Sequence, residues 1–145
     1  MENYLTNSEQ ETKKLAKNLA KKMPSGVVAL SGELGAGKTT FVQGFAKGLG
    51  VTDKIISPTF VLIRQHKIPK TKKILYHIDL YRIEDTLNID KLGIKELIDN
   101  PLNIVIIEWA EKIKSRLPKN TVKISFKIVG GDIRKITLSN PLTLF

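Results

Sequence analysis

Apolar side chains recur at intervals of three and four residues along residues 8–23, and lysines fill most of the positions between them. This spacing is typical of an amphipathic helix. Ser8 and Glu11 stand three residues apart at its start, which is the spacing of a capping box, and a proline, a serine and a glycine follow its end. The pattern therefore predicts a first helix that ends near residue 23.

Two short apolar runs rich in β-branched residues, at 27–31 and 104–108, have the character of strands buried on both faces of a parallel sheet. A glycine-rich segment follows the first run directly. From Lys38 the apolar residues adopt a helical period, which ends at Gly48 and Gly50. Residues 27–50 are therefore predicted to form a strand, a loop and a helix in that order.

The rest of the chain predicts hairpins and short helices. Residues 60–68 and 74–80 resemble strands joined by a short polar connector, so we expect an antiparallel hairpin. Residues 86–100 and 110–116 predict short helical pieces, the first ending before Pro101. Alternating residues around 130–132 predict a terminal hairpin. The expected architecture is α/β: a mixed, mostly parallel central sheet flanked by helices, with antiparallel hairpins.

Composition narrows the class of protein. The length of 145 residues suits a single domain covering residues 1–145. The absence of cysteine excludes disulfides, thiolate metal sites and a cysteine nucleophile. The first residues lack the basic and apolar segments of a secretory signal, and the apolar runs are too short to span a membrane. We therefore expect a cytoplasmic protein without a membrane partner.

The chain is basic, with 24 Lys and Arg against 14 Asp and Glu and a net charge of +10. Such an excess attracts nucleotides, RNA or an acidic protein surface. The lysines are dispersed, however, many of them on faces that a helix or hairpin turns to water. No RNA-binding module with stacking aromatics is recognisable, so the charge by itself leaves these interpretations open.

Residues 32–39, GELGAGKT, match the Walker A pattern G-x-x-x-x-G-K-[ST] at every fixed position. In this motif small residues let backbone N–H groups curl around phosphates, as Gly35, Ala36 and Gly37 would do here. Lys38 would reach the β- and γ-phosphate oxygens, and the Thr39 hydroxyl would bind magnesium. The positive end of the following helix would further attract the phosphates. The loop therefore predicts binding of ATP or GTP with Mg²⁺.

Two carboxylates that end apolar strands are candidate partners of this loop. Glu108 follows 104–107 and is predicted to hold magnesium, directly or through water. The alternative is a glutamate that ends a strand and faces solvent. Asp79 follows 74–78 and could orient water, accept a proton or hold metal-bound water. Its alternative is pairing with Arg82 or capping of a turn.

Two further residues are weaker candidates. Thr59, in Ser57-Pro58-Thr59-Phe60, lies in the connection where other nucleotide switches place a threonine that senses the γ-phosphate. A serine–proline turn has the same sequence. Trp109 is the only tryptophan and adjoins Glu108. It could anchor the core, stack on a base or lie in an interface.

The segments GELGAGKTTF, SPTF, HIDLYR and IEWAE occur in the order and approximate spacing found in the TsaE family, also called YjeE. The resemblance runs from the first predicted helix to the strand after Pro118 and is less distinct in the last hairpin. It implies a P-loop NTPase fold and an ATPase, with ATP and Mg²⁺ as ligands.

The resemblance also implies partners. By this resemblance the protein would act together with the TsaB and TsaD proteins. The three would form threonylcarbamoyladenosine next to the anticodon of tRNAs that read ANN codons. ATP binding would promote docking onto TsaB–TsaD, and hydrolysis would reset the complex, while TsaD resembles the transferase. Contact with tRNA would come through the complex, and direct contact is left open.

Carried over by motif, the resemblance assigns roles to the candidate residues. Glu33 stands where the family often has aspartate, a side chain that the mechanism does not need. Thr12 and Arg134 are candidates for contacting adenine. By this resemblance Lys38, Thr39 and Thr40 would bind the phosphates and magnesium. Glu108 would be the Walker B-like acid, and Asp79 would act in catalysis or support the metal shell. Thr59 would be the switch threonine, and Trp109 would have a functional role.

Two other functions remain compatible with the loop. A small-molecule or nucleotide kinase would pass the γ-phosphate to a bound acceptor, but such enzymes usually close an arginine-rich lid over the phosphates. This chain has only four arginines and no arginine cluster. A nucleotide-gated binding module with incidental turnover is the third interpretation.

Overall fold

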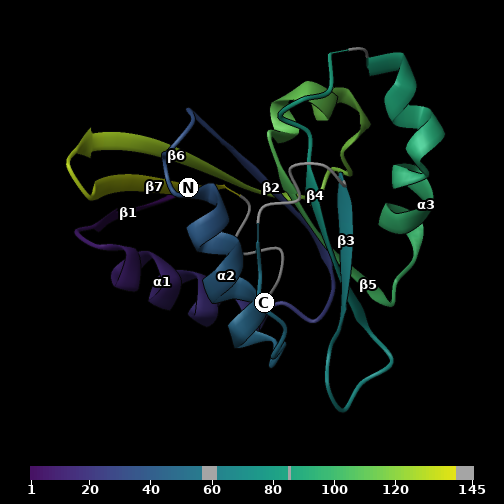
Figure 1. The fold of residues 1–145 in the computed structure, drawn as a ribbon, viewed down its shortest axis with the longest axis horizontal. Coiled ribbons are helices and arrows are strands. Elements are labelled where there is room, and N and C mark those ends of the chain that lie inside the picture. The colour runs from purple at the N-terminus through teal and green to yellow at the C-terminus, as the bar shows by residue number, and fades with distance from the viewer. Residues whose placement is uncertain (57–61, 85, 140–145) are drawn as a thin grey trace.

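The computed structural model describes residues 1–56, 62–84 and 86–139, and these form a mixed α/β fold built on one seven-stranded sheet (Figure 1). The strand order across the sheet is β1-β7-β6-β2-β5-β4-β3. The strands are β1 (Glu2–Thr6), β2 (Gly26–Gly32), β3 (Ile63–Lys67), β4 (Ile74–Asp79), β5 (Asn103–Glu108), β6 (Val122–Gly130) and β7 (Ile133–Ser139). The helices are α1 (Glu9–Lys22), α2 (Lys38–Gly48) and α3 (Ile94–Asp99), with 3₁₀ segments η1 (Thr86–Leu92) and η2 (Ala110–Arg116).

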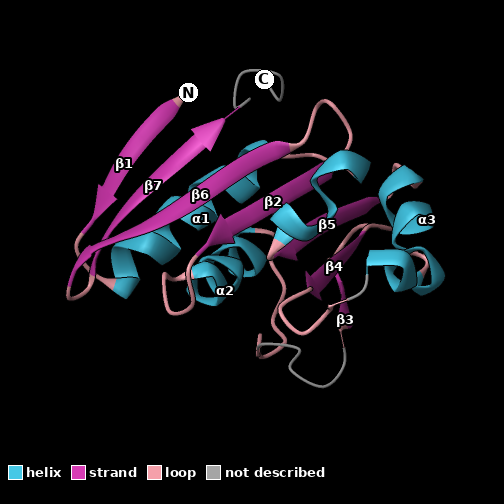
Figure 2. Cartoon of the chain, turned by 90° about the horizontal axis from the view of Figure 1, so that it is seen from above, coloured by secondary structure: helices cyan, strands magenta, loops and turns pink. Residues whose placement is uncertain are grey.

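The centre of the sheet is parallel and its edges are antiparallel. Strands β6, β2, β5 and β4 run parallel to one another, while β7 and β1 extend one side and β3 the other in antiparallel pairs (Figure 2). The expected mixed sheet with hairpins β3–β4 and β6–β7 is thereby confirmed. Parallel strands end at the same edge of a sheet, so the residues that follow β2, β4 and β5 come together.

Helices cover both faces of the sheet, which explains the apolar runs of the central strands. Val28 and Leu30 of β2 face a core cluster built with α1 and α2. Val27 and Ala29 face a second cluster built with η1, α3 and η2. Since successive side chains of a strand point to opposite faces, both faces need apolar residues. The predicted short helical pieces at 86–100 and 110–116 are confirmed as the cover of the second face.

The start of α1 follows the predicted capping pattern in part. The Ser8 hydroxyl accepts a hydrogen bond from the Glu11 backbone N–H at 3.2 Å, as in a capping box. The Glu11 carboxylate accepts from the N–H of Asn7 at 3.3 Å, one residue before the position that the motif uses. Both bonds satisfy backbone donors around the helix start.

Strand β1 has no counterpart among the sequence-based expectations. It pairs with β7, from Glu2 opposite Leu138 to Thr6 opposite Arg134. Its first four residues are exposed, so it shows no alternation of buried and polar positions. Its one buried side chain, Thr6, hydrogen-bonds the Thr12 hydroxyl at 2.8 Å and so joins β1 to α1. Backbone pairing at the sheet edge, rather than burial, defines this strand.

No helix in the described ranges is long and apolar enough to cross a membrane.

Helices α1 and α2 approach closely because α2 carries glycine where they touch. A Cβ atom added at Gly44 would lie 2.6 Å from the Lys13 Cα, and one at Gly48 would lie 2.6 Å from the Lys17 carbonyl oxygen. Both obstacles are backbone atoms, which cannot move without shifting α1. The glycines therefore set the distance between the two helices.

We expect Gly44→Ala to lower the free energy of unfolding by about 1–3 kcal/mol, since overpacking outweighs the better helix propensity of alanine. Chemical denaturation measures this. Gly130→Ala is the matched control, because a Cβ at Gly130 meets nothing within 4 Å. Equal stabilities of the two variants would contradict the close-packing argument.

Candidate nucleotide-binding site

A pocket of about 380 Å³ lies at the carboxyl ends of the central strands, above the start of α2. It brings together most of the residues that the sequence nominates. Its lining includes Gly35, Gly37, Lys38, Thr39, Thr40, Asp79, Glu108 and Trp109, together with Thr12, Tyr81, Arg82 and Arg134. Thr59 lies outside the described residues. Ala36 is the exception, because its side chain is buried in the core and does not line the pocket.

The glycine-rich loop opens its backbone toward the pocket. Gly35 and Gly37 have φ angles of 80° and 104°, in the left-handed region that favours glycine, and a Cβ at either would meet nothing within 4 Å. Gly37 precedes α2, and no side chain caps the first N–H groups of that helix. Free N–H groups at a helix start form an anion-binding site.

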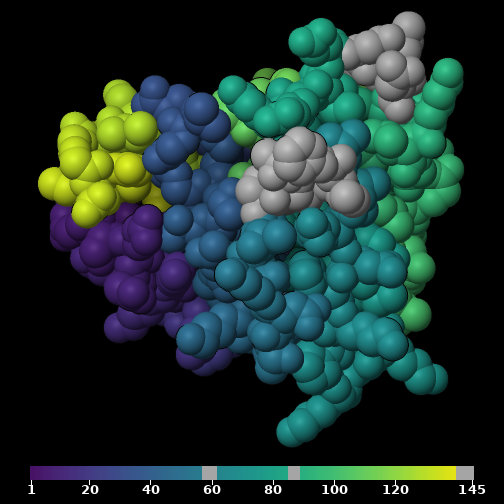
Figure 3. Space-filling view, viewed as in Figure 1, coloured from purple at the N-terminus to yellow at the C-terminus, as the bar shows by residue number. Residues whose placement is uncertain are grey.

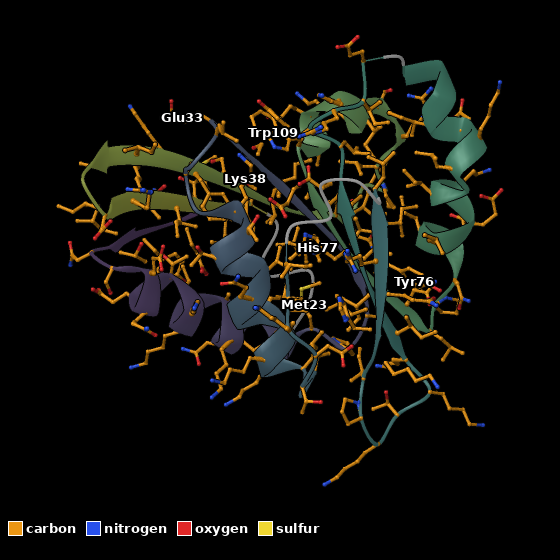
Figure 4. All side chains as sticks on the ribbon, viewed as in Figure 1. Met23, Glu33, Lys38, Tyr76, His77 and Trp109 are labelled. Atoms are coloured by element: carbon orange, nitrogen blue, oxygen red, sulfur yellow. The ribbon has the colours of Figure 1, made fainter. Side chains whose placement is uncertain are left out.

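Lys38 is held against its own loop. Its side-chain nitrogen Nζ donates hydrogen bonds to the carbonyl oxygens of Gly32 and, at 2.9 Å, of Glu33. The same nitrogen lies 4.0 Å from the centre of the Trp109 ring, a cation–π distance (Figure 4). The pKa of Lys38 is lowered below its usual value, because burial outweighs the opposing effect of the nearby carboxylates, Glu108 foremost. The side-chain nitrogen is thus held at the pocket by two carbonyl oxygens and the Trp109 ring.

Glu108 faces the loop and not solvent. Its side chain is buried, with 3% of the residue exposed. The Thr39 hydroxyl donates to both carboxylate oxygens of Glu108, at 2.9 and 3.1 Å. The interpretation of Glu108 as a solvent-facing strand end is therefore wrong. Two residues 69 positions apart form one hydroxyl–carboxylate pair in the pocket.

His77 completes this group and was not among the residues that the sequence nominated. Its Nε2 lies 2.6 Å from the second oxygen of Glu108, and its ring is fully buried (Figure 4). The sequence did contain a signal for His77. It stands two residues before Asp79, and alternate residues of a strand share a face, so the two side chains are expected on the same face. What the sequence lacked was the register, which places His77 opposite Ile106 of β5.

Asp79 lies directly beside Glu108, since the register of β4 and β5 pairs the two residues. One oxygen of Asp79 accepts a hydrogen bond from the Tyr81 N–H at 3.0 Å, so the carboxylate does cap the turn after β4. Asp79 also lines the pocket. The turn-capping and pocket interpretations therefore apply together.

Trp109 has an unusual backbone. Its φ of 59° and ψ of 39° lie in the left-handed region, which is costly for a residue with a large side chain. Its ring packs 5.0 Å from that of Tyr81, with a tilt of 40°. The indole lines the pocket and also packs against the second core cluster.

The other end of the pocket is built by the terminal hairpin and α1. Arg134 donates to the Gly35 carbonyl oxygen at 3.2 Å, and this bond holds β7 against the glycine-rich loop, called the phosphate loop below. Thr12 of α1 also lines the pocket. Both residues that the sequence proposed for adenine contact are therefore at the pocket.

The donor set suits a triphosphate with magnesium. Mg²⁺ prefers oxygen ligands and usually keeps several waters. Thr39 and Glu108 offer such oxygens, and the open backbone with Lys38 suits phosphate oxygens. In the described ranges no three His, Asp or Glu side chains gather as a metal-ligand group. A metal here would rely on phosphate and water for its remaining ligands.

Comparisons with known proteins place the chain in a family. Residues 6–136 match the model of the threonylcarbamoyl adenosine biosynthesis protein TsaE. The chain is 41% identical to the TsaE protein of Bacillus subtilis, over 94% of this chain and 84% of that protein. It is 36% identical to the TsaE protein of Treponema pallidum, over 93% and 98%.

A solved structure agrees with the sequence match. The crystal structure of Bacillus subtilis YdiB superposes with a TM-score of 0.76 at 36% identity, covering 94% of this chain and 83% of that one. Fold, sequence and matched length agree, and the chain belongs to the TsaE family of tRNA threonylcarbamoyladenosine biosynthesis proteins.

Proposed function

We propose that this protein is a magnesium-dependent ATPase that binds ATP in the pocket above α2. The observation that carries the proposal is the half-buried Thr39–Glu108 pair, which lines the same pocket as Lys38 at the end of the parallel central strands. A hydroxyl and a carboxylate at these positions would hold Mg²⁺, which supplies charge neutralisation at the β- and γ-phosphates when bound.

Each residue has a distinct part in the proposal. The N–H groups of Gly35 and of residues 37–39 bind phosphate oxygens, Ala36 joins them only if its N–H leaves the Glu33 carbonyl oxygen, and Thr40 adds a hydroxyl. Lys38 exchanges its bonds to loop carbonyls for phosphate oxygens. His77 holds Glu108 in place, and Asp79 orients the attacking water. Trp109 covers Lys38, and Thr59 is retained as a candidate switch residue.

The protein acts with partners in this proposal. ATP binding favours docking onto TsaB and TsaD, and hydrolysis resets that complex, while the threonylcarbamoyl transfer occurs elsewhere in it. Membership of a tRNA threonylcarbamoyladenosine family supports this role. A cytoplasmic location is part of the same proposal, because tRNA modification takes place where tRNA is used.

The test is to measure ATP hydrolysis and complex formation by this protein alone and with purified TsaB and TsaD. We expect slow turnover alone, and stable assembly and repeated turnover with ATP and both partners. If the partners neither bind nor change turnover while a small metabolite becomes phosphorylated, the kinase alternative replaces the proposal.

The single tryptophan offers a direct readout of binding. Because the Lys38 ammonium lies 4.0 Å from the Trp109 ring, moving that charge to a phosphate should change the indole emission. We expect a saturable change in fluorescence on titration with Mg²⁺–ATP, and the Lys38→Met variant should lack most of it. An emission spectrum unaffected by saturating nucleotide would contradict the proposed movement of Lys38.

A further inference from the structure

The net positive charge lies in one stretch of the chain, because acidic residues are scarce there. Residues 12–78 hold thirteen Lys and Arg but only two acids, Glu33 and Asp53. Glu33 belongs to the phosphate loop, and the Asp53 carboxylate pairs with His66 at 2.8 Å. The remaining acids are shared between the first eleven residues and the C-terminal half. The excess charge therefore has a definite place in the molecule.

Five lysines of this stretch lie toward the end of the sheet opposite the pocket. Strands β2 and β4 begin there, and α2 ends there, whereas the phosphate loop follows the other end of β2 (Figure 1). We call this surface the basic end and define it by five lysines that are exposed: Lys21, Lys47, Lys54, Lys70 and Lys72.

Contacts between the elements make the basic end one continuous surface (Figure 3). Helices α1 and α2 touch backbone to backbone at Gly44 and Gly48. The loop after α2 approaches the β3–β4 hairpin, since a Cβ at Gly50 would lie 3.9 Å from Pro69. Lys73 of the hairpin donates a hydrogen bond to the Pro24 carbonyl oxygen, just beyond α1. The lysines of three separate segments are thus presented together.

A groove of about 780 Å³ runs between α1, α2 and the following loop. Lys13, Lys47 and Lys54 line it, and its one acid, Asp53, is the partner of His66. The groove provides a concave surface with three ammonium groups and little opposing charge. Such a surface suits a chain of closely spaced negative groups.

We propose that the basic end binds the phosphate backbone of RNA. Lysines on a flexible stem bind phosphates as point charges and need no fixed geometry. An acidic protein is the less favoured partner, because protein interfaces carry an apolar centre. In the described part of the chain, none of the exposed large apolar side chains lines this groove. The tRNA-modifying family makes tRNA the natural probe.

The experiment measures binding of the full-length protein to an unmodified tRNA transcript by fluorescence anisotropy, at several KCl concentrations and without nucleotide. Omitting nucleotide keeps the outcome independent of the ATP proposal. The test variant carries Lys47→Gln, Lys54→Gln and Lys70→Gln. The control carries Lys95→Gln, Lys119→Gln and Lys127→Gln, three exposed lysines elsewhere, so both lose the same charge.

We expect the wild-type protein to bind tRNA at about 50 mM KCl with a dissociation constant in the micromolar range. The test variant should bind at least about tenfold more weakly, and its plot of log affinity against log salt should be less steep by about 2–3, since each lost phosphate contact removes about 0.7–0.9. The control variant should bind like the wild type.

Three results would overturn the proposal: no binding at low salt, equal weakening in the control variant, or tighter binding of poly-glutamate than of tRNA. The last result would assign the basic end to an acidic protein. Thermal unfolding checks that each variant is folded. If the triple variant is not folded, the three single test variants are compared with the three single controls, and weaker tRNA binding by the test variants alone supports the proposal.

Discussion

Replacement of Lys38 by methionine is expected to lower ATP turnover by about 100-fold or more, because one preorganised charge at a site of developing negative charge commonly contributes a factor of about 10²–10³. Methionine keeps most of the length and the apolar stem of lysine. Methionine therefore fills most of the same space, and the loss reports on the ammonium group, including its contact with the Trp109 ring. Turnover is measured with TsaB and TsaD present, so that the assembly step is not limiting.

Lys38 also holds its own loop together, so stability must be measured in parallel. Its bonds to the Gly32 and Glu33 carbonyls are lost in the variant, but these carbonyls lie at a loop that water reaches. Lys127→Met, an exposed change on β6, is the control and should leave turnover unchanged. A Lys38→Met protein that is folded and still turns over ATP at a rate within threefold of wild type would exclude Lys38 from catalysis.

The sequence predicts those parts of the structure that depend on neighbours along the chain. The Walker A loop, the helix that follows it and the buried strands at 27–31 and 104–108 are each specified within a few residues. Their combination also specifies the edge of the sheet where the site forms, because parallel strands end together. Asp79 and Glu108 were therefore expected near the loop before their register was known.

The rest of the site depends on contacts between distant residues. The contact of His77 with Glu108 needs the register of β4 and β5, and that of Arg134 with Gly35 spans 99 positions. The left-handed backbone of Trp109 is a strained conformation that no local pattern predicts. Strand β1 escaped prediction because an exposed edge strand has no buried face to reveal it.

The arrangement around Glu108 suggests why its carboxylate can be buried. The single proton of the Thr39 hydroxyl is shared between the two carboxylate oxygens, and the His77 ring contacts Oε2. A buried carboxylate is tolerated only when such partners replace water. The same partners fix the direction of both oxygens, which is what a metal ligand requires. The observed contacts of Glu108 are thus the strongest structural support for its proposed role as a metal ligand.

Replacement of Glu108 by glutamine is the sharpest test of that conclusion. Glutamine has the same shape, and its amide oxygen can accept a hydrogen bond from Thr39, but it lacks the charge that Mg²⁺ needs. We expect turnover to fall by about 100-fold or more, in line with the loss of one electrostatic contribution to catalysis. We also expect the Mg²⁺ concentration for half-maximal nucleotide binding to rise. The protein should still assemble with TsaB and TsaD when ATP is present, held in a state that does not reset.

Glu111→Gln is the matched control, because Glu111 is exposed, lies three residues away and contributes to the field at Lys38 without lining the pocket. It loses the same charge, so a general electrostatic effect would lower both activities. His77→Asn should give an intermediate result, since it removes a support of Glu108 and leaves the carboxylate in place. If Glu108→Gln keeps the wild-type requirement for Mg²⁺, the metal is held elsewhere. Asp79, the neighbouring acid at the end of β4, then becomes the residue to exchange.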